Sequence, residues 1–385
     1  MTTIDLKGHN LTVLMSSNPT NQLEITDSSA VGDGGTLRLL VPAGQTVTNE
    51  KVTFTGSLAL EKAGAGKYIN KIQNAHSGGT AIAEGTFALF NDAHNGTTYA
   101  CVRFRHLGVV GSTVTVATGA TFDLMGNYDL HQYALVLAGG QLTSTTYKMS
   151  TIDNGGIGSL TLTADSTIDL PKTADNVANF LIFNTGNPCW ADLGGHRLTI
   201  DVHPGSGNYL CLKQYGFKNG TVRVVSGGWF RVYGESIEWV NASLEEGAAL
   251  WLDTTVTVED FQCFYQGTSK QGSGGINIKG AYTPGGVLFH NFTMLNGSTF
   301  DLKGLALPWQ LEPITLTAGG QFYVDLAGKT LTSEDPVISW DAANPPEGIQ
   351  QMRFRVSRKP GNPRGELSVR ADGVYFVSGF SIFLR

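Results

Sequence analysis

The stretch Val114-Thr-Val-Ala-Thr-Gly-Ala-Thr-Phe-Asp-Leu124 aligns without gaps on Leu160-Thr-Leu-Thr-Ala-Asp-Ser-Thr-Ile-Asp-Leu170. It aligns again on Phe292-Thr-Met-Leu-Asn-Gly-Ser-Thr-Phe-Asp-Leu302. Each copy reads apolar-Thr-apolar, then a short turn with Gly or Asp, then Thr-apolar-Asp-Leu. Apolar residues that alternate with Thr indicate a strand with one buried face. The copies predict two strands joined by a turn, with Val114, Leu160 and Phe292 facing inward.

A second motif marks the turns. Asp5-Leu-Lys-Gly-His-Asn-Leu-Thr12 matches Asp192-Leu-Gly-Gly-His-Arg-Leu-Thr199 and Asp325-Leu-Ala-Gly-Lys-Thr-Leu-Thr332, and each predicts a strand end, a Gly turn and a new strand. The repeated acids are 46 residues apart (Asp123 to Asp169), 23 apart (Asp169 to Asp192) and 24 apart (Asp301 to Asp325). A unit of about 23 residues is too short to bury a core of its own, so the units must stack.

Composition agrees with this architecture. Glycine accounts for 49 of 385 residues and charged residues for 15%, which suits short strands joined by frequent turns. The 41% hydrophobic content excludes wholesale disorder. We therefore predict an all-β fold: a parallel β-helix, or solenoid, over residues 1–335, with irregular, aromatic-rich coils at about 205–285. Since Asn344-Pro-Pro-Glu-Gly348 reads as a loop, residues 336–385 are predicted to form a small C-terminal β cap.

One segment resembles a known family. Leu58-Ala-Leu-Glu-Lys62, Gly64-Ala-Gly66, Gly78-Gly-Thr80 and Gly85-Thr-Phe87 are similar to the autotransporter-associated β-strand repeat, and Gly119-Ala-Thr-Phe-Asp-Leu-Met-Gly126 resembles the segment that commonly follows it. The match covers roughly a quarter of the chain, and Phe87 stands where Leu is usual. The resemblance implies a right-handed β-helical passenger that is secreted and held at a bacterial cell surface. It implies no enzymatic activity.

Two functional hypotheses follow, and a third ranks below them. The first is a surface-displayed or secreted bacterial structural or adhesive solenoid without catalysis, whose partners would be glycans or a host or neighbouring cell surface. The second is a polysaccharide-acting β-helix enzyme, a lyase or a glycoside hydrolase. The third is a phage tail or fibre protein. Two unpaired carboxylates in a deep acidic groove would favour the enzyme, because glycoside hydrolysis uses a pair of carboxyl groups.

The sequence offers no catalytic, cofactor-binding or metal-ligating set, so we predict none. The repeated acids each precede a Leu and a turn, and a turn acid that accepts backbone N–H bonds explains them more simply than catalysis. His9 and His196 share one position of the turn motif, which argues for a structural role. Asp92 and His94 could form a metal pair but lack further ligands.

Charge and cysteine content bound the partners and the compartment. From Gln351 to Arg385 there are seven Lys/Arg and two acids, or +5, which leaves −11 for the rest of a chain of net charge −6. Nothing indicates nucleic acid, and no stretch is apolar enough for a membrane span. No export signal or anchor occurs in this chain, so the extracellular or cell-surface location is an expectation. Cys189 and Cys211 lie about one repeat apart and could stack on neighbouring coils.

Overall fold

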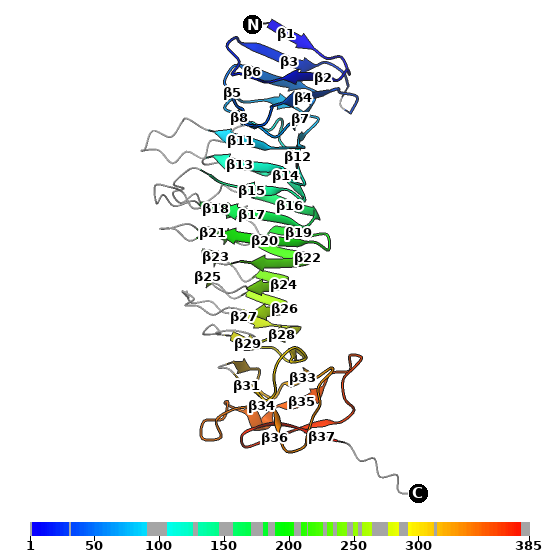
Figure 1. Ribbon diagram of the computed structural model, residues 1–385, viewed down its shortest axis with the longest axis vertical. Coiled ribbons are helices and arrows are strands. Elements are labelled where there is room, and N and C mark those ends of the chain that lie inside the picture. The colour runs from blue at the N-terminus through cyan, green and yellow to red at the C-terminus, as the bar shows by residue number, and fades with distance from the viewer. Residues whose placement is uncertain are drawn as a thin grey trace. The chain divides into compact units, whose positions relative to one another are not determined.

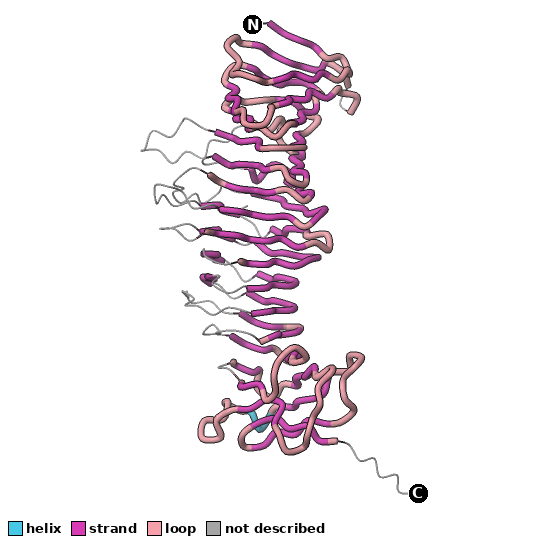
Figure 2. The backbone as a smooth tube through the Cα atoms, viewed as in Figure 1, coloured by secondary structure: helices cyan, strands magenta, loops and turns pink. Residues whose placement is uncertain are grey.

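The computed structural model describes the greater part of the 385 residues and divides into two units, residues 1–235 (unit 1) and residues 236–385 (unit 2). The described backbone comprises residues 2–30, 32–90, 106–125, 130–145, 157–170, 180–183, 189–203, 209–213, 215–225, 229–233, 237–244, 249–252, 256–263, 276–284, 292–311 and 314–378. The predicted all-β class is confirmed: strands dominate the described residues, and their one helix is the short 3-10 turn η1 (Ile349–Gln351), cyan in Figure 2. None of these residues forms a helix suited to crossing a bilayer.

Unit 1 consists of parallel strands that follow one another in a fixed order, so that strands separated by one turn of chain lie side by side (Figure 1). Stack A contains β1 (Thr2–Asp5), β3 (Leu23–Asp27), β6 (Val52–Gly56) and β9 (Ala75–His76). Stack B contains β2 (Leu11–Leu14), β4 (Thr36–Leu40), β7 (Ala59–Ala63), β10 (Thr80–Ile82), β12 (Thr113–Ala117), β14 (Leu130–Ala138), β16 (Ile157–Ala164), β19 (Cys189–Asp192) and the first half of β22 (Tyr215–Val224).

Stack C follows stack B along the chain. It contains β5 (Thr46–Asn49), β8 (Lys67–Asn70), β11 (Thr86–Phe90), β13 (Thr121–Met125), β15 (Gln141–Thr143), β17 (Ser166–Leu170), β20 (Arg197–Val202) and the second half of β22. Another parallel set, β18 (Phe180–Phe183), β21 (Tyr209–Lys213) and β23 (Trp229–Tyr233), comes after stack C. Long parallel sheets visited in turn by the chain are compatible with a β-solenoid.

The core of unit 1 is a set of in-register columns. In stack C each inward position of one strand pairs with the inward position of the next, giving the buried column Val47, Tyr68, Phe87, Phe122, Leu142, Ile168, Ile200 and Val224. The ring centroids of Phe87 and Phe122 are 6.3 Å apart. In stack B, Val114, Leu135 and Leu160 form a similar buried column, so the predicted inward orientation of Val114 and Leu160 is confirmed.

Outward positions of stack C form a polar column beside the apolar one. It runs Thr46, Lys67, Thr86, Thr121, Gln141, Thr167, Thr199 and Arg223, with parallel pairing at every step. Because side chains alternate across a strand, the period-two pattern in the sequence separates these two columns. Threonines therefore recur along the outward face of this stack.

Unit 2 repeats the parallel arrangement and then changes it. β24 (Ile237–Leu244) pairs with β26 (Val256–Cys263), from which two parallel series continue: β27 (Ile276–Ile278), β29 (Phe292–Met294) and β32 (Thr315–Leu316); and β28 (Ala281–Thr283), β30 (Thr299–Asp301), β33 (Gln321–Asp325) and β35 (Arg353–Val356). β25 (Ala249–Leu252) lies between β24 and β26 in the chain. Phe292, the third predicted inward residue, is buried.

The end of unit 2 contains the antiparallel pairing. β31 (Trp309–Gln310) pairs in parallel with β34 (Pro336–Ser339), whereas β37 (Gly373–Val377) runs antiparallel to both β34 and β36 (Glu366–Arg370). These strands bury Val337, Ile338 and Tyr375. A change from parallel to antiparallel pairing interrupts the parallel repeat, which suits the end of a stack.

Candidate functional site

Three of the repeated acids, Asp5, Asp192 and Asp325, mark turns, as predicted. In three copies of the turn motif, the four residues that begin at the leucine form the turn. The main-chain N–H of the fourth of them donates to the carbonyl of that leucine: His9 to Leu6 (2.9 Å), His196 to Leu193 (2.7 Å) and Lys329 to Leu326 (3.0 Å). The preceding carboxylates accept the N–H two residues on: Asp5 from Lys7 (3.2 Å), Asp192 from Gly194 (3.1 Å) and Asp325 from Ala327 (3.2 Å). Gly8, Gly195 and Gly328 have φ of 80°, 85° and 76°, which explains the glycine at the third position.

The predicted spacing of these acids is wrong at one place. Asp169 in β17 pairs with Asp201 in β20, 32 residues later, and not with Asp192. Asp192 ends β19 in stack B, where its partners are Thr161 and Lys218. The Asp-Leu-x-Gly motif specifies a turn rather than one corner of the coil, because Asp5 uses it after stack A and Asp192 uses it after stack B. The number of residues between two copies of the motif therefore does not always equal the length of one coil.

Asp169, Asp201 and His203 form the one group with metal-ligand side chains that the described residues bring together. His203 Nε2 lies 3.2 Å from Asp169 Oδ1 and 3.6 Å from Asp201 Oδ2, and the three donor atoms are all within 4.8 Å of one another. Gln141 Nε2 donates to the other oxygen of Asp169, Oδ2, at 2.6 Å. The set has ligand types that suit a divalent transition metal.

The surroundings of Asp169 change the pKa of its carboxyl group. Burial raises the pKa of Asp169 above its ordinary value, and the negative charge of Asp201 adds to this, whereas His203 and the Gln141 hydrogen bond oppose it. Asp169 Oδ1 is enclosed, and apart from the imidazole nitrogen no described group is placed to bond it. A carboxyl whose protonated form is favoured, with a second carboxyl beside it, is an arrangement used in acid–base chemistry on glycosides.

Asp169 and Asp201 line a small groove. It has a volume of about 260 Å³, and its walls are Gly119, Ala120, Gly139, Gly140, Gln141, Thr167, Asp169 and Asp201. Glycines at three of these positions keep the groove open, because any side chain there would reduce its width. The groove therefore opens beside two partly exposed aspartate side chains, Asp169 and Asp201.

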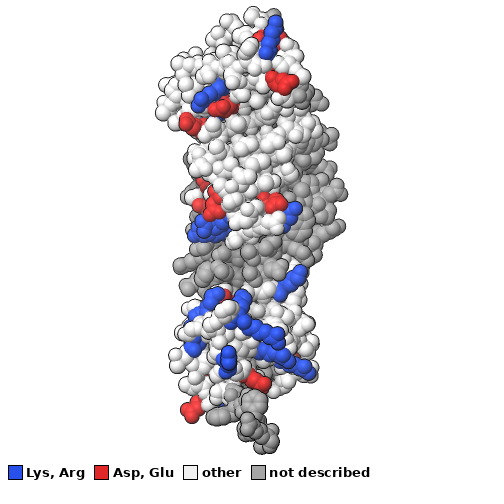
Figure 3. All heavy atoms as spheres, turned by 90° about the vertical axis from the view of Figure 1, so that its right-hand side faces the viewer, with Lys and Arg blue, Asp and Glu red and all other residues white. Residues whose placement is uncertain are grey.

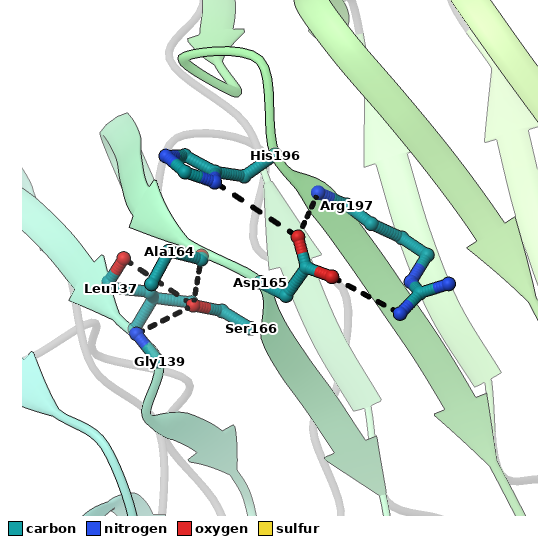
Figure 4. A network of polar contacts seen from close by, with 7 residues as sticks. All are labelled: Leu137, Gly139, Ala164, Asp165, Ser166, His196 and Arg197. Carbon is teal, nitrogen blue, oxygen red and sulfur yellow. Dashed lines mark hydrogen bonds and ion pairs between the residues drawn. The ribbon is translucent and has the colours of Figure 1, made fainter.

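A polar network holds the corner next to this groove (Figure 4). Ser166 Oγ donates to Ala164 O (2.9 Å), has Leu137 O as a second acceptor at 3.3 Å, and accepts from the Gly139 N–H (3.1 Å). Beside it, Asp165 accepts from Arg197 N (2.8 Å) and Arg197 Nη2 (3.0 Å).

The His196 ring is the other neighbour of the Asp165 carboxylate, with Nδ1 4.0 Å from Oδ1. These contacts join residues of β14, β16, β17 and β20 and so fix the groove wall. His196 thus belongs to a structural corner.

Lys62 shows what the family-like motif does in this fold. It occupies an inward position of stack B between Leu39 and Ile82 and is fully buried. Its ammonium donates to the carbonyls of Gly64 (2.6 Å) and Glu84 (2.8 Å), which ties two successive corners together. Burial lowers the pKa of Lys62 to about 8, against the opposing charge of Glu84. The lysine therefore has a structural role: it links two corners through hydrogen bonds. The sequence pattern alone does not show this role.

Unit 2 contains a larger groove of about 840 Å³. Ile314, Leu316 and Trp340 lie at its apolar base, and the indole Nε1 of Trp340 donates to Ala371 O at 2.8 Å. Polar side chains surround this base: the amides and hydroxyls of Gln310, Thr315, Thr317, Asn344 and Gln351, and the carboxylates of Asp341 and Glu347. An apolar base with polar groups around it suits a polar ligand such as a sugar.

The remaining predictions concern the cysteines, Asp92 and His94, and the aromatic-rich coils. Cys189 lies in β19 opposite Tyr215, and Cys211 lies in β21 opposite Ile182 and Arg231, so the predicted stacking of these two cysteines is wrong. Asp92 and His94 lie outside the described residues, as do the side chains of the aromatic group between Trp229 and Tyr265.

The fold and the groove define an all-β protein built of long parallel sheets with an acidic surface groove. No family model, curated protein or solved structure matches the chain. The resemblance to the autotransporter-associated repeat therefore stays a prediction.

Proposed function

We propose that this chain is a bacterial structural or adhesive β-solenoid, displayed at the cell surface or secreted, with right-handed coils and no enzymatic activity. The observation that carries the proposal is the outward polar column of stack C. Eight paired positions present threonine five times, at Thr46, Thr86, Thr121, Thr167 and Thr199. A surface that repeats the same groups along a stack suits a repeating partner, such as a glycan chain, through many weak contacts.

The expected binding is distributed along the column. On a glycan array, the purified chain should retain multivalent glycans, and Thr121→Ala alone should change the apparent affinity less than about twofold. The combined change of Thr86, Thr121, Thr167 and Thr199 to Ala should lower it at least tenfold, because each contact contributes a similar share. A matched control replaces four threonines outside this column: Thr12, Thr53, Thr115 and Thr293. Equal losses in both fourfold variants, or full loss from Thr121→Ala, would contradict distributed binding.

The second candidate, a polysaccharide-acting enzyme, is favoured by the in-register pair Asp169 and Asp201. Their closest oxygens lie within 4.8 Å, near the separation of about 5–5.5 Å typical of retaining glycosidases. The raised pKa of Asp169 suits a general acid. Against catalysis, His203 and Gln141 already engage Asp169, so display remains the proposal.

A reducing-sugar release assay on the glycans retained by the array separates the two functions. We expect no release above that of the Asp169→Asn variant. If release occurs, and if both Asp169→Asn and Asp201→Asn abolish it while Asp165→Asn does not, the display proposal fails and the enzyme replaces it. Asp165 is a suitable control because its carboxylate lies on the adjacent corner and bonds Arg197.

A further inference from the structure

Lys and Arg side chains gather on the face of unit 2 that Figure 3 shows, with few acids among them. In unit 2, one stretch of chain contains five exposed basic residues: Arg353, Arg355, Arg358, Lys359 and Arg364. We call these five residues the basic face. It is built by strand β35 and the segment that follows it.

Strand pairing sets the first part of the basic face. β35 runs parallel to β33, so Arg353 lies opposite Gln321 and Arg355 opposite Tyr323. Phe354 between them is buried, which directs both guanidinium groups to solvent. Alternate residues of a strand are about 6.6 Å apart, so the two arginine side chains lie next to each other on the same face of β35.

Hydrogen bonds hold the second part against the turn after β33. Asn362 Oδ1 accepts from Leu326 N (2.6 Å), and Asn362 Nδ2 donates to Asp325 Oδ1 (2.9 Å). The Lys359 carbonyl accepts from Asn362 Nδ2 (3.2 Å) as well. The segment that carries Arg358 and Lys359 is therefore positioned before any ligand arrives, which lowers the entropic cost of binding.

The charges of the basic face have no acidic partner among the described residues. Several cations elsewhere in the molecule have an acidic partner: Arg38 has Glu61 (3.2 Å), Lys67 has Asp123 (2.9 Å) and Lys303 has Asp301 (2.9 Å). The nearest turn acid, Asp325, is buried and accepts from Ala327 and Asn362 instead. Five preorganised, unpaired cations require counterions, and a polyanion would release several small ions at once.

We propose that the basic face binds an acidic polysaccharide, with uronate carboxylates held by its arginines. Arginine is suited to carboxylates because its guanidinium forms two parallel hydrogen bonds to them. Gln321 and Tyr323 lie in the same surface, joined by a 2.7 Å hydrogen bond, and offer an amide and a phenol to sugar hydroxyls. Duplex DNA is less suitable, because its one charge per roughly 1.7 Å would meet repulsion from a chain of net charge −6. The inference rests on unit 2 alone and not on the display role.

The test measures binding of the full chain to immobilised polygalacturonate at about 50 mM salt, with neutral dextran and duplex DNA in parallel. The basic-face variant changes Arg353, Arg355, Arg358 and Lys359 to Gln. The control variant changes Lys7, Arg38, Lys51 and Arg197 to Gln, which removes the same charge from unit 1. We expect polygalacturonate binding that weakens with salt, a loss of at least tenfold in the basic-face variant, and less than threefold in the control.

Three results would overturn the proposal. Failure to bind polygalacturonate removes it, and equal losses in both variants show attraction to charge in general. Tighter binding of DNA than of polygalacturonate assigns the surface to nucleic acid. The glycan-array test of the proposed function depends on the polar column of stack C in unit 1, so it can succeed or fail independently of these outcomes.

Discussion

Replacing Phe122 with Ala should destabilise unit 1 by about 3–5 kcal/mol, the usual cost of removing a buried phenylalanine ring. Phe122 is fully buried in β13 and lies in the apolar column of stack C between Phe87 and Leu142. The missing ring would leave a cavity that touches the coils on both sides. In stacked repeats each unit depends on its neighbours, so the loss should spread to those coils.

The adjacent residue supplies a matched control. Thr121 is on the same strand but points outward in the polar column, so Thr121→Ala should cost less than about 1 kcal/mol. Urea denaturation followed by far-ultraviolet circular dichroism gives the free energies, and hydrogen exchange of β11, β13 and β15 shows where stability is lost. Comparable losses for the two variants would mean that the inward column is not the main source of stability.

The sequence predicts this column because the alternation of apolar and polar residues within each strand is enough to specify which side chains are buried. The aligned segments that begin at Val114 and Leu160 become the same structure, β12 with β13 and β16 with β17. They are separated by two coils, since Val114 pairs with Leu135 (21 residues on) and Leu135 with Leu160 (25 residues on). The predicted unit of about 23 residues is therefore close to the mean length of these two coils. Alternating burial dictates these strands, and no distant contact is needed to specify them.

The candidate groove was not predictable to the same degree. Thr167-Ile-Asp169 and Thr199-Ile-Asp201 are identical tripeptides, which is the signal that could have paired them. Their separation of 32 residues does not fit a 23-residue unit, because the chain between β17 and β20 is longer than an average coil. His203 reaches Asp169 only once this register is known. Contacts between coils of unequal length depend on the loops, which the repeat does not encode.

Unit 1 should lose about 3 kcal/mol of stability as pH falls from about 6.5 to about 4, because of His76. Burial lowers the pKa of His76 to about 4, against about 6.5 in an unfolded chain. Its ring has no exposed surface, and Nε2 contacts Thr80 Oγ1 at 3.0 Å. The folded state keeps the imidazole neutral, so the stabilisation is complete above pH 6.5. It is lost below that value as the unfolded chain takes up the proton, at about 1.4 kcal/mol for each pH unit.

The measurement is hydrogen exchange of β9 to β11 at several pH values, corrected for intrinsic exchange rates. His76→Gln cannot titrate, so its stability should stay nearly constant from pH 6.5 to pH 4, whereas the control His196→Gln should keep the wild-type slope. Asp27 does not obscure this window. Burial opposes its ionised form, but hydrogen bonds from Ser29, Gly35 and Gly8 hold the pKa of Asp27 at about 2, so its contribution disappears only below pH 4. A wild-type slope that persists in His76→Gln would assign the acid sensitivity to another group, and a flat wild-type profile would show that His76 is protonated inside the fold.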